Sequence, residues 1–144
     1  LSAFLGGIIG FERESHGQGA GFRTNLLVAI GACLMMLLSL AIADLYNQYT
    51  VNTIIRHDPA RIASYAIASM GFLGAGAIIK GKGSVRGLTT AASLWLVTGI
   101  GLSVGAGIYL PAVLTTIISL IVLYPLRFFR QNITREQYTI LTIK

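Results

Sequence analysis

Long apolar stretches separated by short polar turns run through most of the chain. The five stretches are roughly residues 1–11, 26–43, 62–79, 89–103 and 111–126. A helix that spans a bilayer needs about 20 apolar residues, with a lower limit near 17. The first stretch is shorter, so we expect the chain to start partway through its first helix. The pattern predicts an all-α integral membrane protein, a bundle of five transmembrane helices.

The same pattern divides the chain into two regions. Residues 1–130 are the predicted five-helix transmembrane domain, and residues 131–144 are the predicted start of a cytoplasmic C-terminal region. Residues 138–143 are rich in side chains that favour strands. We therefore expect the tail to be the first strand of a soluble domain.

Composition agrees with a membrane environment. The chain is 54% hydrophobic and only 11% charged, whereas a soluble domain carries about 25% charged residues. The net charge is +6, but the basic residues lie in short turns and form no continuous patch. We therefore expect the lipid bilayer, with its anionic headgroups, as a partner and no nucleic acid.

Basic residues are divided unequally between the two ends of the predicted helices. One end carries only Arg56 and Arg61. Cytoplasmic loops of membrane proteins carry the excess of lysine and arginine, so the richer end is predicted to be cytoplasmic, with the N-terminus outside and the C-terminus inside. The basic residues of the richer end are Arg13, Arg23, Lys80, Lys82, Arg86, Arg127, Arg130, Arg135 and Lys144.

Small residues recur at helical spacing on three of the predicted helices. Ser64, Ala68, Gly71 and Ala75 form a stripe along the third helix. Small residues allow helices in lipid to pack with close backbones. Two interpretations remain open, packing among the five helices or recognition of another membrane protein. The candidate packing glycines are Gly6, Gly10, Gly71, Gly74, Gly76, Gly101 and Gly105.

A cluster of charges is predicted where the first helix meets the cytoplasmic interface. It consists of Glu12, Arg13, Glu14, Arg23 and Arg86. A carboxylate near hydrocarbon is costly unless it is paired. We therefore expect Arg23 or Arg86 to pair with one of the two glutamates. The alternative is that the glutamates contact water at the interface.

Two further groups of polar residues have both a structural and a functional interpretation. The loop around Lys80 and Lys82 resembles a P-loop, but no serine directly follows either lysine and the segment before it is a membrane helix. The two lysines remain candidates for binding a lipid phosphate, beside a simpler role in setting orientation. Asp58 is predicted to cap the third helix from the outer face, with Arg61 reaching the headgroups.

Side chains for catalysis and metal binding are scarce. His16 and His57 fall at opposite ends of the predicted helices, and the chain has only five acidic residues. Glu12 and Glu14 are weak candidates for a magnesium site, because magnesium prefers carboxylate oxygens. No catalytic residue, no dedicated metal site and no cofactor are predicted, and we do not expect an enzyme.

Five segments carry a recognisable pattern in a fixed order along the chain: GGIIGFERE (6–14), AGFRT (20–24), DPARI (58–62), GFLGAG (71–76) and SVRGLTTAASLW (84–95). Together they resemble the transmembrane domain of the MgtC/SapB family of bacterial inner-membrane proteins. The resemblance implies an inner-membrane location, a role in adaptation to low magnesium and in virulence, and, in many members, a C-terminal ACT-like domain that here would be truncated. It also implies the ATP synthase as a partner, since one member is described as restraining that enzyme within the membrane.

Two functions compete at this stage. The leading hypothesis is a non-enzymatic regulator that acts through helix contacts with other membrane proteins. The alternative is a small transporter or channel for magnesium or another cation, with Glu12 and Glu14 at its mouth. A third option is a fragment of a larger assembly that is inactive alone, and a homodimer or larger oligomer is also expected. A polar path for the cation would use Asn25, Ser39, Thr98 and Ser103.

Overall fold

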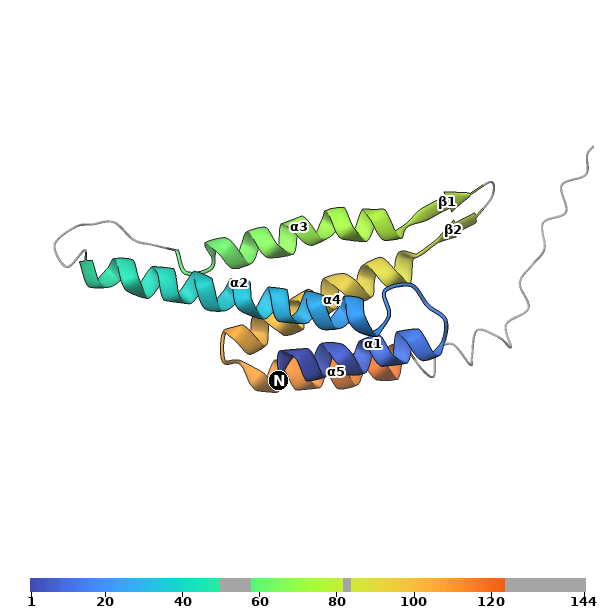
Figure 1. The fold of residues 1–144 in the computed structure, drawn as a ribbon, viewed down its shortest axis with the longest axis horizontal. Coiled ribbons are helices and arrows are strands. Elements are labelled where there is room, and N and C mark those ends of the chain that lie inside the picture. Colours follow the sequence, from blue (N-terminus) through green and yellow to red (C-terminus); the bar gives the residue numbers. More distant parts are fainter. Residues whose placement is uncertain (50–57, 82–83, 124–144) are drawn as a thin grey trace, which may run out of the picture.

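The computed structural model describes residues 1–49, 58–81 and 84–123. Five helices and a two-stranded antiparallel hairpin account for most of these residues (Figure 1). The predicted C-terminal region, with its ACT-like strand, and Lys82 lie outside the described residues. The helices are α1 (Ser2–Ser15), α2 (Phe22–Tyr49), α3 (Arg61–Ala77), α4 (Leu88–Gly105) and α5 (Tyr109–Leu123), and the strands are β1 (Ile79–Gly81) and β2 (Ser84–Arg86).

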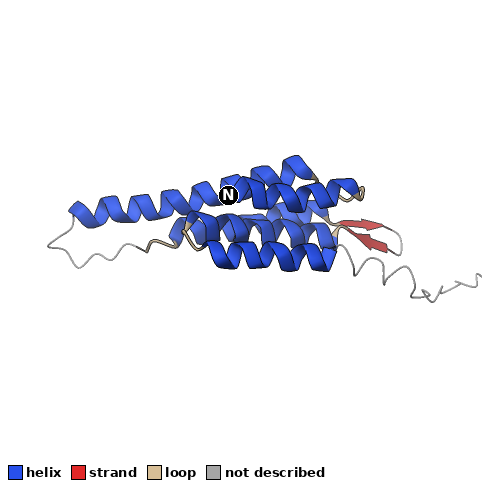
Figure 2. Cartoon of the chain, turned by 90° about the horizontal axis from the view of Figure 1, so that it is seen from below, coloured by secondary structure: helices blue, strands red, loops and turns tan. Residues whose placement is uncertain are grey.

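The helices run side by side along one axis in an elongated bundle (Figures 1 and 2). The long helix α2 contacts α1, α3 and α4, and α4 contacts all four other helices. The helix α3 lies on one edge of the bundle, away from α1 and α5 (Figure 1). The α1–α2 loop and the hairpin lie at one end of the bundle, and the α4–α5 turn lies toward the other end (Figure 1).

The core is centred on α4. Its residues Val97 and Ile100 pack with Ile9 of α1 and Ala29 of α2, and all four side chains are at most 1% exposed. A second, smaller cluster joins Leu102 of α4 to α2 and α3. The sequence places apolar side chains all around α4, and the structure surrounds that helix with neighbours.

Glycines bring the backbones of α1 and α4 close to α2. A Cβ atom added at Gly6 would lie 2.5 Å from the Cβ of Ala29, and one added at Gly101 would lie 2.5 Å from the Ala29 carbonyl oxygen. Gly10 and Gly105 meet the α2 backbone or side chains at similarly short distances. At these four positions the small residues serve packing within the chain.

The small residues of α3 are placed differently. This helix buries only Ala63, Met70 and Gly74, and a Cβ added at Gly74 would lie 3.5 Å from Ala91 of α4. A Cβ added at Gly71 would meet no atom within 4 Å. All four members of the stripe predicted from the sequence are exposed on the outside of the bundle. We call these residues, Ser64, Ala68, Gly71 and Ala75, the α3 stripe.

A turn at Gly87 precedes the helix α4. The helix α4 begins at Leu88 after Gly87, so Thr89 and Thr90 lie inside the helix and do not cap it. Gly87 has φ +88°, and a Cβ there would overlap the Ala77 carbonyl. Only glycine allows this turn between the hairpin and α4.

Asp58 does not cap the third helix, as was predicted, but the turn before it. Its carboxylate accepts a hydrogen bond of 2.9 Å from the backbone N–H of Ala60, and α3 begins one residue later, at Arg61. Asp58 therefore caps the turn that precedes the helix, because Pro59 continues that turn instead of opening α3. The turn is tied to α2 by the hydroxyl of Ser39, which donates to the Pro59 carbonyl at 2.5 Å.

The outer surface of the bundle is apolar. Large hydrophobic side chains are exposed on every helix, among them Phe72 of α3 at 84% and Leu27 of α2 at 67%. Two helices, Phe22–Tyr46 within α2 and Leu88–Gly105, are long and apolar enough to cross a membrane. Only 22% of the most apolar stretch of α2 is buried inside the chain. Most of the apolar surface of this helix is therefore exposed on the outside of the bundle.

The glycine contacts lead to a first prediction on α4. Gly101→Ala should destabilise the bundle by about 1–3 kcal/mol, because the added methyl group overpacks the contact with Ala29. Gly99→Ala is the matched control, since a Cβ at Gly99 meets nothing within 4 Å. Thermal unfolding of both purified variants in detergent measures the difference. Equal melting temperatures would contradict the packing argument.

Candidate functional site

Charged side chains gather at the end of the bundle that holds the α1–α2 loop and the hairpin. We call this the charged end. In the described part of the chain, the other end carries Asp44, Asp58 and Arg61. By the bounds of their elements, the charged residues at or beside the charged end are Glu12, Arg13, Glu14, Arg23, Lys80 and Arg86.

Arg13 is the most deeply buried of these charges, with 2% of its surface exposed. Its guanidinium donates to the hydroxyl oxygen of Thr90 on α4 at 2.6 Å and to the carbonyl oxygen of Gly19 in the α1–α2 loop at 3.2 Å. Hydrogen bonds to a charged group are among the stronger ones in proteins. Arg13 therefore joins α1, the loop and the start of α4.

Glu14 binds the start of α2. Its Oε2 accepts a hydrogen bond of 2.8 Å from the backbone N–H of Phe22, the first residue of that helix. The first N–H groups of a helix have no partner inside it, and the helix dipole favours a negative charge there. A Cβ at Gly21 would lie 2.7 Å from the same carboxylate oxygen, so the absence of a side chain at Gly21 makes room for the cap.

The predicted pairing of arginine with glutamate is wrong. Glu12 pairs with His16, one turn later on α1, at 3.2 Å between Oε1 and Nδ1. Within the described residues, neither Arg23 nor Arg86 forms an ion pair with Glu12 or Glu14. The two carboxylates instead find their partners within α1 and at the start of α2.

Asn25 of α2 holds the α1–α2 loop in place through hydrogen bonds. This side chain is fully buried, and its amide nitrogen donates to the carbonyl oxygens of Ala20 and, at 3.0 Å, Gly21. Ala20 has φ +53°, a left-handed conformation that is uncommon for a residue with a side chain. Arg13 and Asn25 together donate to three consecutive carbonyl groups, those of Gly19, Ala20 and Gly21, and so fix the second half of the loop.

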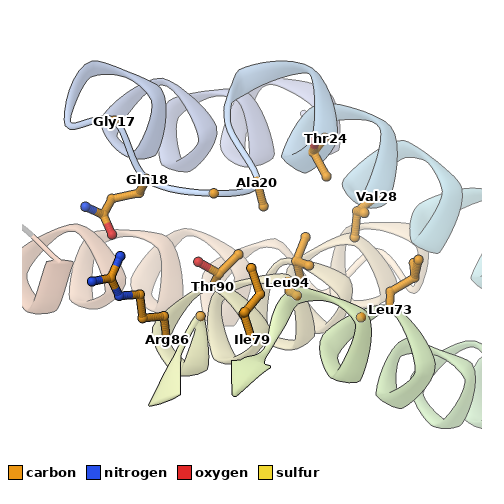
Figure 3. A pocket seen from close by; sticks show the side chains of 14 residues that line it. Gly17, Gln18, Ala20, Thr24, Val28, Leu73, Ile79, Arg86, Thr90 and Leu94 are labelled. Atoms are coloured by element: carbon orange, nitrogen blue, oxygen red, sulfur yellow. The ribbon is translucent and has the colours of Figure 1, made fainter. Parts of the chain in front are cut away.

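A cavity of about 540 Å³ lies between this loop, the first turns of α2, α3, the hairpin and the start of α4. In Figure 3, Gln18 and Arg86 point toward each other at one side, while Val28, Leu73 and Leu94 lie at the other. Among the residues that the structure describes, no acidic side chain lines the cavity. The lining residues are Gly17, Gln18, Gly19, Ala20, Thr24, Val28, Leu73, Gly76, Ala77, Ile79, Arg86, Gly87, Thr90 and Leu94.

The strand pairing brings Arg86 to this cavity. Arg86 of β2 is the partner of Ile79 in β1, and both line the cavity. Lys80, one of the two predicted lipid-phosphate lysines, is exposed on β1 and does not line it. Sequence reasoning placed Arg86 near the charges of α1, and it missed the cavity because three separate segments enclose it.

No three His, Cys, Asp or Glu side chains come together as a metal site in the part of the chain that the structure describes. The weak magnesium candidates, Glu12 and Glu14, bind His16 and the start of α2 as described above.

Comparison with protein families identifies the group to which this chain belongs. The model of the MgtC family matches residues 1–132. The chain belongs to the MgtC family. No solved protein structure matches it significantly.

Three relatives of this MgtC-family chain show how much of each protein is shared. The MgtC protein of Salmonella typhimurium is 40% identical over 91% of the chain and 52% of its own length. The MgtC protein of Brucella abortus is also 40% identical, over 78% of the chain and 43% of its own length. YhiD of Escherichia coli strain K12, whose name refers to magnesium transport, is 38% identical over 85% of the chain and 56% of its own length. The chain thus spans about half the length of the relatives that it matches.

The buried arginine leads to a second prediction. Thr90→Val should destabilise the protein by about 1–3 kcal/mol, because it removes an acceptor from a buried charged donor without changing side-chain shape much. Thr89→Val is the matched control, since Thr89 is the exposed neighbour on the same helix. Thermal unfolding in detergent compares the two. If Thr90→Val unfolds no earlier than Thr89→Val, the bond to Arg13 does not hold the charged end together.

Proposed function

We propose that this MgtC-family chain is a multi-pass protein of the bacterial inner membrane, with five membrane helices and its charged end in the cytoplasm. The apolar outer surface of the bundle supports an environment of lipid. Among the described residues, Arg13, Arg23, Lys80 and Arg86 lie at the charged end and Arg61 at the other. This asymmetry favours a cytoplasmic charged end and an N-terminus outside.

The lengths of the helices are compatible with this placement. The helices α1, α3 and α5 have 14, 17 and 15 described residues, or about 21–26 Å at 1.5 Å per residue. A hydrocarbon core of about 30 Å accommodates short helices by local thinning and by flanking polar residues. The longer helices α2 and α4 provide the spans around which the shorter ones pack.

Within that membrane, we propose that the protein is a non-enzymatic regulator that acts through helix contacts with other membrane proteins during adaptation to low magnesium. The α3 stripe is the observation that carries this proposal. Gly6 and Gly10 of α1 and Gly101 and Gly105 of α4 are used for packing within the chain. The α3 stripe, in contrast, is exposed on the edge of the bundle. A stripe of small residues allows another helix to approach closely in lipid.

The α3 stripe has a suitable position for such a contact. The helix α3 contacts α2 and α4 on one side, and its buried residues Ala63, Met70 and Gly74 account for that side. The stripe lies about a quarter of a turn or more away from them around the helix. The ATP synthase, suggested by the family resemblance, and a second copy of this chain are the two partners to test first.

A cation transporter is the rival proposal, and the name of the YhiD relative supports it. Three side chains of the predicted polar path donate hydrogen bonds to backbone carbonyl groups of the chain itself. The hydroxyl of Thr98 donates to the Leu94 carbonyl one turn earlier in α4, Ser39 donates to Pro59 and Asn25 donates to the α1–α2 loop. Neither these three residues nor Ser103, the fourth member of the predicted path, lines the cavity described above.

Magnesium flux into liposomes that contain the purified protein separates the two proposals. A regulator predicts influx equal to that of empty liposomes. Influx that the wild type supports and that Glu14→Gln abolishes would favour the transporter. Because Glu14 caps α2, the variant must first show wild-type thermal unfolding.

The α3 stripe leads to a third prediction. Ala68→Leu and Gly71→Leu should each reduce growth at low magnesium to the level of a strain without the protein, because the larger side chains hold a partner helix away. Ser69→Leu is the control, since Ser69 is exposed on another side of α3. Carbonate extraction checks that all variants are inserted. Inserted stripe variants that restore full growth would overturn the helix-contact proposal.

A further inference from the structure

We propose that the cavity at the charged end binds one anionic phospholipid, with the phosphate at Arg86 and part of an acyl chain against Val28, Leu73 and Leu94. This inference rests on the proposed placement in a membrane, but not on the proposed role of the α3 stripe. Basic pockets between helices on the cytoplasmic side are a recurring kind of site for anionic lipid headgroups.

Arg86 has the features expected of the phosphate ligand. Its side chain is exposed, and it makes no hydrogen bond or ion pair with any described residue. It lines the cavity and points toward Gln18 (Figure 3). A guanidinium binds phosphate oxygens with two parallel N–H groups. The amide nitrogen of Gln18 donates to the carbonyl oxygen of His16 at 3.3 Å, and its amide oxygen faces Arg86 (Figure 3).

The start of α4 adds to the positive potential of this region. Gly87, the residue before the helix, provides no side-chain cap for the first N–H groups. Gly87 and Thr90 both line the cavity, so the positive end of the helix dipole lies beside it. The nearby carboxylates of Glu12 and Glu14 do not line the cavity.

The opposite side of the cavity distinguishes a lipid from a free phosphate. Val28, Leu73 and Leu94 come from three different helices and present apolar side chains (Figure 3). The volume of about 540 Å³ falls within the usual range of about 300–1,000 Å³ for sites that bind small molecules. A phosphate ion alone would leave this apolar part empty, whereas an acyl chain fills it.

Lipid retention measured by native mass spectrometry tests the proposal. The protein is purified in detergent with equal amounts of phosphatidylglycerol and phosphatidylcholine. We expect the wild type to retain one phosphatidylglycerol, and Arg86→Gln to retain it about tenfold less, as expected for the loss of a charge-assisted contact. Arg23→Gln is the control, because Arg23 is an exposed arginine at the same end that does not line the cavity. Equal retention by both variants, or by both lipids, would overturn the proposal.

A second pair of variants tests the acyl chain. Gly76 lines the cavity, and a Cβ there would meet no atom within 4 Å, so Gly76→Leu should fill the apolar part and reduce lipid retention about tenfold by occupying its volume. Gly99→Leu is the control, since Gly99 also has open space and lies outside the cavity. Unchanged retention in Gly76→Leu, or displacement of the lipid by inorganic phosphate, would show a phosphate site without an acyl chain and overturn the proposal. Neither readout depends on growth at low magnesium, so the lipid site and the regulatory role fail separately.

Discussion

Three helix backbones meet at Ala29, and the remaining packing of the bundle depends on that meeting point. The side chain of Ala29 is fully buried, with Gly6 of α1 on one side and Gly101 of α4 on another. The hydroxyl of Ser2 donates to its carbonyl oxygen at 2.6 Å. In lipid, apolar burial does not drive helices together, so close backbone contact supplies the dispersion energy that holds them. A side chain larger than a hydrogen atom at either glycine would separate these helices.

This close packing also determines what happens at the charged end. With α1 held against α2, the loop between them must turn within residues 16–21, and Arg13 is carried into the interior beside α4. A buried guanidinium is costly unless its donors are satisfied. Thr90 and Gly19 satisfy part of this requirement, and the loop is thereby fixed over one side of the cavity. The position of the cavity thus follows from the packing of the helices.

The sequence predicted the helical segments and much of the close packing, because both depend on local patterns. Gly6, Gly10 and Glu14 share one helical face, and in the structure all three contact α2 or the residue before it. The bond from Arg13 to Thr90 joins residues 77 positions apart, and no periodicity reports such a pair. The same reason explains why the partners of the glutamates were predicted wrongly: nearby backbone and side-chain groups compete with distant arginines, and only the three-dimensional arrangement decides between them.

The helix α3 connects the two proposed surfaces. Its outward side carries the α3 stripe, and its residues Leu73, Gly76 and Ala77 form one wall of the cavity. The helix α3 buries three residues whereas α4 buries nine. A lipid in the cavity, as proposed above, would add contacts to those that hold α3 in place. A partner on the stripe acts on the same helix. Two ligands that bias the position of one element influence each other's affinity by the same factor. The lipid composition around the charged end and the occupancy of the stripe are therefore expected to be coupled through α3.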